Sequence, residues 1–239
     1  MSGKRLVHLK VEFIISGYAS NLVGTFGTNY TTSSLFSQTA VLTALTYNLK
    51  MIQDLRESWK PFNQQIFATP AVPKTSVNTD IQIISVKSET GLAIKHTVGE
   101  KTSVPQHGYW EFLKPGTQFV THILAKEEKL LPHIRKTFWI GKKLTLAKIV
   151  DIKVDKATIK TGNYTTIPVE ILKPIPRQDL ENMKKGTIKI LEITNRSVIF
   201  EGTLSGMFAE TSQRENIYLS QQAQKLLLQN FDLKHCSER

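Results

Sequence analysis

The chain has 239 residues, of which 40% are hydrophobic, so it can bury the core of one large domain or two small ones and is not a disordered tail. Lys and Arg outnumber Asp and Glu by 31 to 20, which gives a net charge of +11 and a pI of about 9.6. A positive field of this size favours polyanionic partners, such as nucleic acid or an anionic membrane surface.

Cys236 is the only cysteine, which excludes a disulfide framework and a cysteine-based metal site within one chain. This usage fits a reducing cytoplasm. The apolar run at residues 6–16 is interrupted by His8, Lys10 and Glu12, so it is neither a signal peptide nor a membrane span. We therefore expect a soluble cytoplasmic protein without a membrane partner.

The run at residues 6–16, LVHLKVEFIIS, is also the first predicted element. Its odd-numbered positions from Val7 to Ile15 are apolar and the positions between them include His8, Lys10 and Glu12, which predicts a half-buried β-strand. A polar loop is expected to follow, up to residue 34. Apolar residues at helical spacing then predict a helix over residues 41–52, with Ser33 or Ser34 available as its N-cap.

Residues 59–114 are punctuated by prolines, and a hairpin turning near Gly91 is expected inside this stretch. We interpret it as an insertion that projects from a main sheet formed by residues 1–58 and 115–239. Further strands are predicted at residues 117–126 and 165–172, and residues 138–154 are predicted to form one long strand or a pair with a bend at Gly141. A hairpin is predicted at 186–202, and a helix behind Ser220 with Ala223, Leu226, Leu227 and Phe231 on one face. The predicted fold class is α+β, with mostly antiparallel strands and two helices on one face. A ferredoxin-like core with an inserted hairpin is the simplest such arrangement.

Several catalytic and cofactor motifs are missing from the sequence. There is no GxxxxGK[ST] loop, no strand–GxGxxG–helix unit, no HExxH and no GxSxG, which argues against nucleotide hydrolysis and dinucleotide binding. The six histidines show no ligand-like spacing. No metal site and no cofactor are therefore expected.

Positive charge is concentrated between His133 and Gly162, where the net charge is +6. Neutralising about six phosphates would give strongly salt-dependent binding. Phe138 and Trp139 lie inside this cluster and can stack on splayed bases, although one of two adjacent strand aromatics normally points inward. Lys148 is equally consistent with the solvated face of an ordinary strand. The glycine-bearing segment from Gly17 to Tyr30 is similarly ambiguous, because its tyrosines could stack on bases whereas flexible connectors have the same composition.

Taken in order, five stretches resemble the handle-binding (Cas-five-type) subunit of type I-D interference complexes, a member of the CRISPR repeat-associated (RAMP) superfamily. These stretches are YASNLVGTFGTNYTTSSLFSQTAVLTALTY, FATPA, VPQHGYWEFLKPGTQFVTHIL, IRKTFWIGKKLTLAKI and TTIPVEILKPIP. The fourth resembles the family's "lGk" strand, here Ile140, Gly141 and Lys142. The resemblance covers roughly residues 5–180, and the serial order of short motifs carries most of its weight.

This resemblance implies a ferredoxin-like (RRM-like) core with a β-hairpin thumb inserted between the first helix and the next strand. It implies a subunit of a Cascade ribonucleoprotein complex of antiviral defence, which grips the 5′ handle of the guide RNA and caps the foot of the complex. The implied partners are the guide RNA, the backbone subunits, the large subunit and target DNA near the PAM end. The expected RNA-binding residues are Tyr18, Asn29, Tyr30, Arg135, Lys136, Trp139, Gly141, Lys142 and Lys143, and the expected thumb lysines are Lys74, Lys87, Lys95 and Lys101.

No catalytic residue is expected, because the glycine-rich C-terminal loop of RNA-processing relatives is missing. The closest string, EGTLSGMFAE, contains Gly202 and Gly206 but no lysine. One alternative is a metal-independent endoribonuclease that processes CRISPR precursor RNA, with His8 or His122 and Tyr18 or Tyr30 as acid and base at a 2′-OH. A second alternative is a basic scaffold or ribosome-associated protein without preference for an RNA end.

Overall fold

The computed structural model describes residues 5–26, 29–46, 66–85, 107–126, 136–141 and 145–228. Nine strands form one large sheet: β1 (Arg5–Ile15), β4 (Ile66–Ala68), β5 (Val72–Pro73), β8 (Gln118–Ala125), β9 (Thr137–Ile140), β10 (Thr145–Leu172), β11 (Thr187–Ile193), β12 (Ser197–Glu210) and β13 (Asn216–Tyr218). Four strands form a small sheet: β2 (Leu22–Phe26), β3 (Asn29–Thr32), β6 (Thr79–Ser85) and β7 (His107–Leu113). The described helices are α1 (Gln38–Thr46), α4 (Arg177–Lys185) and α5 (Gln221–Leu228).

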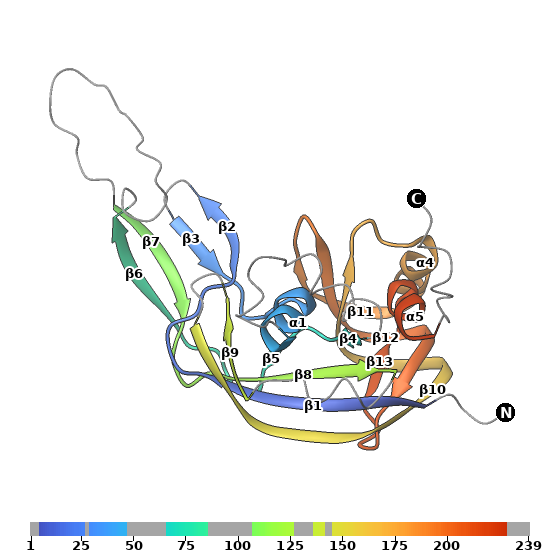
Figure 1. Ribbon diagram of the computed structural model, residues 1–239. Helices are drawn as coiled ribbons and strands as arrows, with labels where there is room; N and C mark the ends of the chain where they lie inside the picture. Colours follow the sequence, from blue (N-terminus) through green and yellow to red (C-terminus); the bar gives the residue numbers. More distant parts are fainter. Residues whose placement is uncertain are drawn as a thin grey trace, which may run out of the picture.

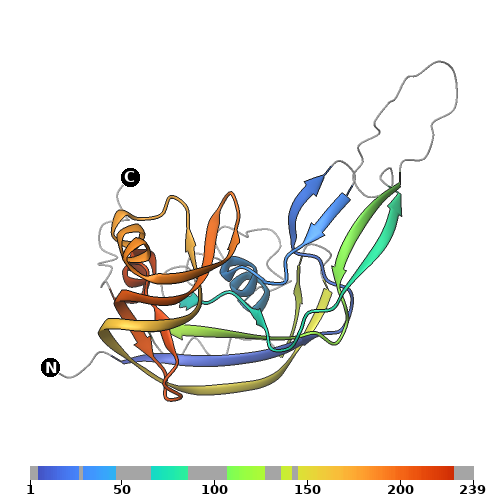
Figure 2. The same ribbon diagram turned by 180° about the vertical axis from the view of Figure 1, so that it is seen from behind.

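The large sheet has the order β11-β12-β10-β1-β8-β4, and all of its pairs are antiparallel. It curls into a half-barrel with α1 on the concave side, while the small sheet projects from one end (Figure 1). The small sheet has the order β2-β3-β7-β6, in which only β3 and β7 are parallel. Figure 2 shows the same projection from behind. The prediction of helices combined with mostly antiparallel strands, on which the α+β class rests, is confirmed.

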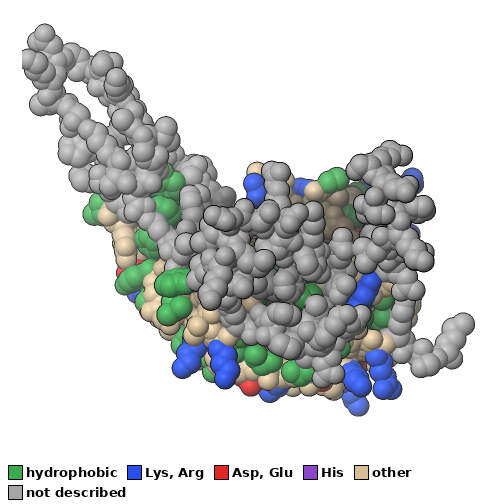
Figure 3. All heavy atoms as spheres, in the orientation of Figure 1, with side chains coloured by type: hydrophobic (Ala, Val, Ile, Leu, Met, Phe, Trp, Pro, Cys, Tyr) green, Lys and Arg blue, Asp and Glu red, His purple; other side chains and the backbone are tan. Residues whose placement is uncertain are grey.

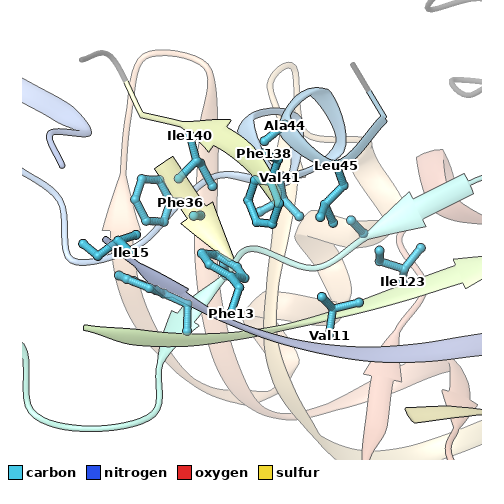
Figure 4. Close-up of a cluster of buried hydrophobic side chains, with 14 of the residues drawn as sticks. Val11, Phe13, Ile15, Phe36, Val41, Ala44, Leu45, Ile123, Phe138 and Ile140 are labelled. Atoms are coloured by element: carbon cyan, nitrogen blue, oxygen red, sulfur yellow. The ribbon is translucent and has the colours of Figure 1, made fainter. Parts of the chain in front are cut away.

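The main core lies between β1, β8, the β9–β10 hairpin and α1 (Figure 4). The alternation predicted for β1 is correct, since Leu9, Val11, Phe13 and Ile15 are all buried on one face. The Phe13 ring stacks on Phe119 at 5.4 Å between centroids and meets the edge of Phe138 at 5.2 Å. Such aromatic pairs add about 0.5–1.5 kcal/mol each beyond the burial of their area. A second cluster packs β12 and β13 against α4 and α5.

Helix α1 begins at a different cap from the one expected. The Ser37 hydroxyl accepts a hydrogen bond from the amide of Ala40 at 3.3 Å, and the Glu170 carboxylate of β10 accepts one from the amide of Gln38 at 2.5 Å. The Ser33 hydroxyl instead accepts a hydrogen bond from the amide of Leu35 at 2.9 Å, before the helix. The expectation of a cap at Ser33 or Ser34 was therefore wrong, because residues 33–36 first pass the core before the helix starts. The part of the predicted helix beyond residue 46 lies outside the described residues.

Two further expectations about secondary structure need correction. The polar segment expected to be a loop contains the β2–β3 hairpin of the small sheet. Helix α4 was missed, because its sequence RQDLENMKK is almost entirely polar and buries only Asp179 and Met183. The Asp179 carboxylate accepts a hydrogen bond from the Tyr218 hydroxyl at 2.8 Å, and Met183 packs in the second cluster, so two buried side chains hold this helix in place of a continuous apolar stripe.

The segment interpreted as an insertion is divided between the two sheets. Strands β6 and β7 belong to the projecting sheet, whereas β4 and β5 pair with β8 in the large sheet. Ser85 of β6 pairs with His107 of β7, and the expected turn near Gly91 lies outside the described residues. The predicted strands at residues 117–126 and 165–172, the hairpin at 186–202 and the helix behind Ser220 are all present, with Phe231 beyond the described part of that helix.

Candidate nucleic-acid interface

The β9–β10 hairpin presents one aromatic residue to each side of the large sheet. Phe138 is 3% exposed and packs in the core, whereas Trp139 is 47% exposed. Trp139 pairs across the hairpin with Leu146, and Thr137 pairs with Lys148, so these four side chains share the outer face. The expectation that only one of the two adjacent aromatics can stack on a base agrees with this geometry.

The turn of this hairpin meets the segment that contains Tyr18. Gly141 has a φ of +80°, and a Cβ at this position would lie 2.9 Å from the carbonyl oxygen of Ser20. The Thr145 hydroxyl donates a hydrogen bond to the carbonyl of Tyr18, and the amide of Ser16 donates one to the carbonyl of Leu146 at 2.8 Å. Two candidate regions that are more than 100 residues apart in sequence therefore touch through their backbones. The need for glycine at position 141 follows from this close approach.

The two candidate tyrosines belong to an aromatic series on the small sheet. The Tyr30 ring stacks on Trp110 at 4.9 Å, Trp110 stacks on Phe112 at 5.5 Å, and Phe112 meets Tyr18 edge-on at 6.2 Å. The exposed Tyr18 hydroxyl donates a hydrogen bond to Asp80 at 3.1 Å, which raises the pKa of Tyr18. The series links β3, β7 and the segment before β2, so its rings have a structural role in the small sheet. Asn29 lies at the start of β3.

The lysines of the predicted basic cluster fall into two groups. Lys160 pairs with Glu210 at 2.8 Å and its Nζ lies 3.7 Å from the centre of the Tyr164 ring, and Lys153 lies 3.9 Å from Asp151. Exposed cations without an ion pair to any described residue are Lys136, Lys148 and Lys156. Figure 3 shows lysine and arginine side chains beside hydrophobic ones along the lower border of the large sheet. The positions of Arg135, Lys142 and Lys143 lie outside the described residues.

Of the four expected thumb lysines, Lys74 is described, and it lies at the large sheet. It follows β5, its amide donates to the carbonyl of Gln118 at 3.0 Å, and its ammonium group contacts Glu12 at 2.6 Å. Lys87, Lys95 and Lys101 fall between β6 and β7, outside the described residues.

The two histidines considered for catalysis meet beneath a loop on the outer face of β1. His8 Nε2 lies 3.0 Å from His122 Nδ1, and His8 Nδ1 lies 2.5 Å from the Asp155 carboxylate. Both histidines are buried, at 1% and 5% exposure. Tyr18 contacts Asp80 and Phe112, and Tyr30 contacts Trp110, so the structure does not join either tyrosine to the histidine pair.

The loop between β12 and β13 covers this pair. Ser212 donates hydrogen bonds from its hydroxyl and its amide to Asp155, and Lys10 Nζ contacts Glu215 at 2.8 Å. Although desolvation raises the pKa of Asp155, hydrogen bonds from Ser212 and His8 outweigh it and leave that pKa below its usual value. Burial, and after it the charges of His8 and Lys10, lowers the pKa of His122 to about 3. His122 is therefore a neutral buried group at physiological pH.

Sequence reasoning missed two features around these sites. The i, i+2 spacing of Trp110 and Phe112 in HGYWEFL indicated a shared aromatic face, but nothing local identified Tyr30 as its neighbour. The contact of His8 with Asp155 joins residues 147 positions apart, and no spacing rule reveals it. Within the described part of the chain, no group of three or more His, Cys, Asp or Glu side chains is arranged to hold a metal ion. Over the same residues, no helix has the length and apolar character needed to cross a membrane.

Comparison with known proteins identifies the family of this chain. The sequence model described as type I-D CRISPR-associated protein Cas5/Csc1 matches residues 17–227. Because the match spans most of the chain, the protein belongs to this family. The resemblance inferred from short motifs is confirmed, and the match extends past residue 180, where that resemblance ended.

No curated protein matches the chain. Among solved structures, a chain in the type III-B Cmr-beta complex bound to cognate target RNA is similar at 16% identity and a TM-score of 0.45, covering 64% of this chain and 61% of that chain. A CRISPR protein from Archaeoglobus fulgidus has 14% identity and a TM-score of 0.43, with coverages of 88% and 98%. A chain of Cmr-beta bound to cognate target RNA and AMPPnP has 11% identity and a TM-score of 0.46, with coverages of 82% and 86%. The chain thus spans less than two thirds of the first of these.

Proposed function

We propose that this protein is a non-catalytic guide-RNA-binding subunit of a type I-D CRISPR interference complex, which grips the 5′ handle of the guide RNA and caps the backbone of the complex. Membership of the type I-D Cas5/Csc1 family and a net charge of +11 both support this proposal. The expected partners are the guide RNA, the backbone and large subunits, and target DNA near the PAM end, in the cytoplasm.

The observation that carries the proposal is the outer face of the β9–β10 hairpin. Trp139 is half exposed there, and Lys148 lies on the same face without an ion pair to a described residue. A large aromatic surface costs free energy when it faces water, and a cation beside it attracts phosphate. An extended RNA strand satisfies both, because its bases stack on the indole and its phosphates approach the lysines.

The proposal includes a ferredoxin-like core and a thumb. The β-α-β-β order of such a core is matched by β1, α1, β4 and β8, and β10 supplies the last strand beside β1. The residues between β8 and β9, where a ferredoxin-like core carries its second helix, lie mostly outside the described part. The projecting β6–β7 pair is the proposed thumb, and it follows β4 and β5 and precedes β8 instead of directly following the first helix.

Titration of a labelled RNA carrying the repeat-derived 5′ handle tests the proposal. We expect Lys142→Ala with Lys143→Ala to weaken binding and to flatten the slope of log affinity against log salt by about 1–2 units. The matched control is Lys184→Ala with Lys185→Ala, which removes two adjacent exposed lysines from α4. An unchanged slope in the first variant, or an equal change in the control, would contradict the proposed RNA contact. Competition with an unrelated RNA of equal length separates this function from a basic scaffold.

Among the described residues, the contact between His8 and His122 is the feature that favours a metal-independent endoribonuclease instead. Its geometry suits a structural role better, since both rings are buried under the β12–β13 loop and neither tyrosine joins them. Incubating the purified protein with labelled CRISPR repeat RNA in EDTA distinguishes the two functions. We expect no defined product, and a single cut that is lost in His8→Ala would establish the enzyme.

A further inference from the structure

The middle of strand β10 has a neighbouring strand on one side only. β1 pairs with residues 147–158 of β10. On the other side of β10, pairing with β9 ends at Lys148 and pairing with β12 begins at Thr158. Among the described residues, no strand pairs with residues 150–157 on the side away from β1. In Figures 1 and 2 this part of β10 forms the lower border of the large sheet.

Hydrogen bonds define both ends of this unpaired edge, where β9 and β12 stop pairing with β10. The amide of Ile149 still bonds to the carbonyl of Lys136, which closes the β9 end. At the other end Glu210 pairs with Thr158, and the chain then turns away from the edge. Arg214 adopts a left-handed φ of 62° in that turn, and hydrogen bonds from Ser212 to Asp155 hold the turn over the outer face. The gap of about eight residues is therefore part of the fold.

Three exposed apolar side chains, Val150, Ile152 and Val154, alternate at the gap with charged ones, among them Asp151 and Lys153. Ile152 and Val154 pair with Val11 and Leu9 of β1, which are fully buried, yet they are themselves 38% and 53% exposed. Val150, the extra residue at a β-bulge between the two strands, is 57% exposed. Edge strands of soluble proteins are normally blunted, because unpaired amides and carbonyls beside β-branched side chains invite another strand. Here the bulge and the charged residues Asp151, Lys153, Asp155 and Lys156 blunt the edge only partly, because the three apolar side chains between them stay exposed.

We propose that residues 150–157 of β10 accept an extended strand from a neighbouring protein subunit, which continues the large sheet by β-addition. This inference rests on the proposed function for the presence of such a subunit. The incoming strand needs apolar residues at alternate positions, facing Ile152 and Val154, and an acidic residue opposite Lys153. About five to eight residues of it fit along the roughly 25 Å of free edge.

A protein strand fits this edge better than either alternative occupant. Nucleic acid stacks on aromatic rings and neutralises cations, whereas this edge offers backbone amides and carbonyls that have no strand partner among the described residues, beside aliphatic side chains and equal numbers of acidic and basic ones. A second copy of the chain also carries a net charge of +11, so the two positive fields repel each other. A separate subunit can supply acidic residues beside its apolar ones.

Amide hydrogen exchange of the full chain tests the inference. The chain is compared alone, with guide RNA alone, and with the type I-D backbone and large subunits added singly and together with guide RNA. We expect the exchange of residues 150–157 to slow at least tenfold with one of the protein subunits and to stay unchanged with RNA alone. Protection by RNA alone, or in a self-associated dimer seen by sedimentation, would assign the edge to another occupant and overturn the inference.

A pair of variants tests the side chains. Ile152→Lys with Val154→Lys is expected to weaken binding of that subunit at least tenfold while handle-RNA affinity of the free chain is retained. The matched control is Ile190→Lys with Ile193→Lys, two exposed isoleucines on β11, the strand at the end of the sheet. Equal losses in both variants would overturn the assignment to β10.

The two proposals fail in different ways. If the chain binds handle RNA and joins the complex but residues 150–157 exchange as fast as in the free chain, the strand inference is wrong and the proposed function stands. If it binds neither the RNA nor the subunits, both are wrong.

Discussion

The two faces of strand β1 are built from alternate residues of one eleven-residue segment, but they are held by different forces. On the concave face, Leu9, Val11, Phe13 and Ile15 are buried in an aromatic and aliphatic core. On the outer face, each polar residue meets a partner from another element. These partners are Asp155 for His8, Glu215 for Lys10 and Lys74 for Glu12.

The contrast between the two faces shows that the apolar residues of β1 need only a core to be buried in, whereas its polar residues need specific partners from other elements. Burial of apolar area is non-directional, so the concave face needs only side chains of suitable volume. The outer face needs donors and acceptors at fixed positions, because a buried polar group without a partner costs about 1–3 kcal/mol. The concave face should therefore dominate stability, and the outer face should determine its dependence on pH.

The largest expected change in the free energy of unfolding comes from a substitution on the concave face. Phe119 is fully buried and lies 4.9 Å from Phe36 and 5.4 Å from Phe13, between ring centroids. Phe119→Ala removes these contacts and leaves a cavity, so we expect the free energy of unfolding to fall by about 3–5 kcal/mol in urea titrations. The loss should be equal at pH 7 and pH 5. Phe119→Leu, which keeps most of the volume, should cost less than half as much, and an equal cost would argue against cavity formation.

The next effect concerns pH on the outer face. The pKa of His122 is about 3 in the folded chain and about 6.5 in the unfolded chain, so below pH 6.5 the unfolded state binds one more proton. Stability therefore falls as the pH drops from 7 to 5, by about 2 kcal/mol from this residue. His8, Lys10, Asp155 and Glu215 surround the ring from β1, β10 and the β12–β13 loop.

His122→Gln should remove most of this pH dependence, because an amide can still donate to His8 but does not titrate in this range. Urea titrations at pH 7 and pH 5 measure the difference for each protein. Phe119→Leu serves as the control, since it should keep the full wild-type difference. If His122→Gln retains that difference, the pH dependence arises elsewhere in the chain.

The contrast between the faces also explains how much of the structure the sequence predicts. The period of two in residues 6–16 predicts the strand and its core face, because alternation alone determines which side chains share a side. The same pattern cannot show that His8 is buried, since its cover comes from residues 211–215. Helix α4 was not predicted for a similar reason. Its buried contact between Asp179 and Tyr218 is long-range, and its sequence lacks the apolar stripe that predicts a helix.

In the candidate site too, local sequence patterns predict the elements but not the long-range contacts. The adjacency of Phe138 and Trp139 implied that one ring points outward, and pairing with Leu146 shows which. The contact between the Gly141 turn and Ser20 and the pairing of Lys160 with Glu210 depend on long-range topology. Local patterns thus identified the hairpin and its charge, whereas the distribution of free and paired lysines required the fold.

A smaller effect on stability is expected where the β12–β13 loop is hydrogen-bonded to the outer face. Ser212 donates its hydroxyl to Asp155 and helps to hold the loop over the histidine pair. Ser212→Ala removes one hydrogen bond to a charged but partly exposed group, so we expect about 1 kcal/mol of destabilisation at pH 7. Because this hydrogen bond favours the ionised carboxylate of Asp155, the loss should be largest where Asp155 is ionised and should shrink as the pH falls from 5 to 3. Thr75→Ala, an exposed residue outside the cluster, is the control and should cost nothing measurable.

The smallest effect on stability should come from Trp139, an apolar residue on the outer face. It is half exposed and pairs only with Leu146 across the hairpin, so Trp139→Ala should change the free energy of unfolding by less than about 0.5 kcal/mol. Handle-RNA affinity should nevertheless fall about 5- to 150-fold, because stacking of one base contributes about 1–3 kcal/mol. Trp139→Phe should restore most of the affinity, since a phenyl ring also stacks. A variant that loses stability but not affinity would place Trp139 with the core residues and leave the outer face without its proposed RNA contact.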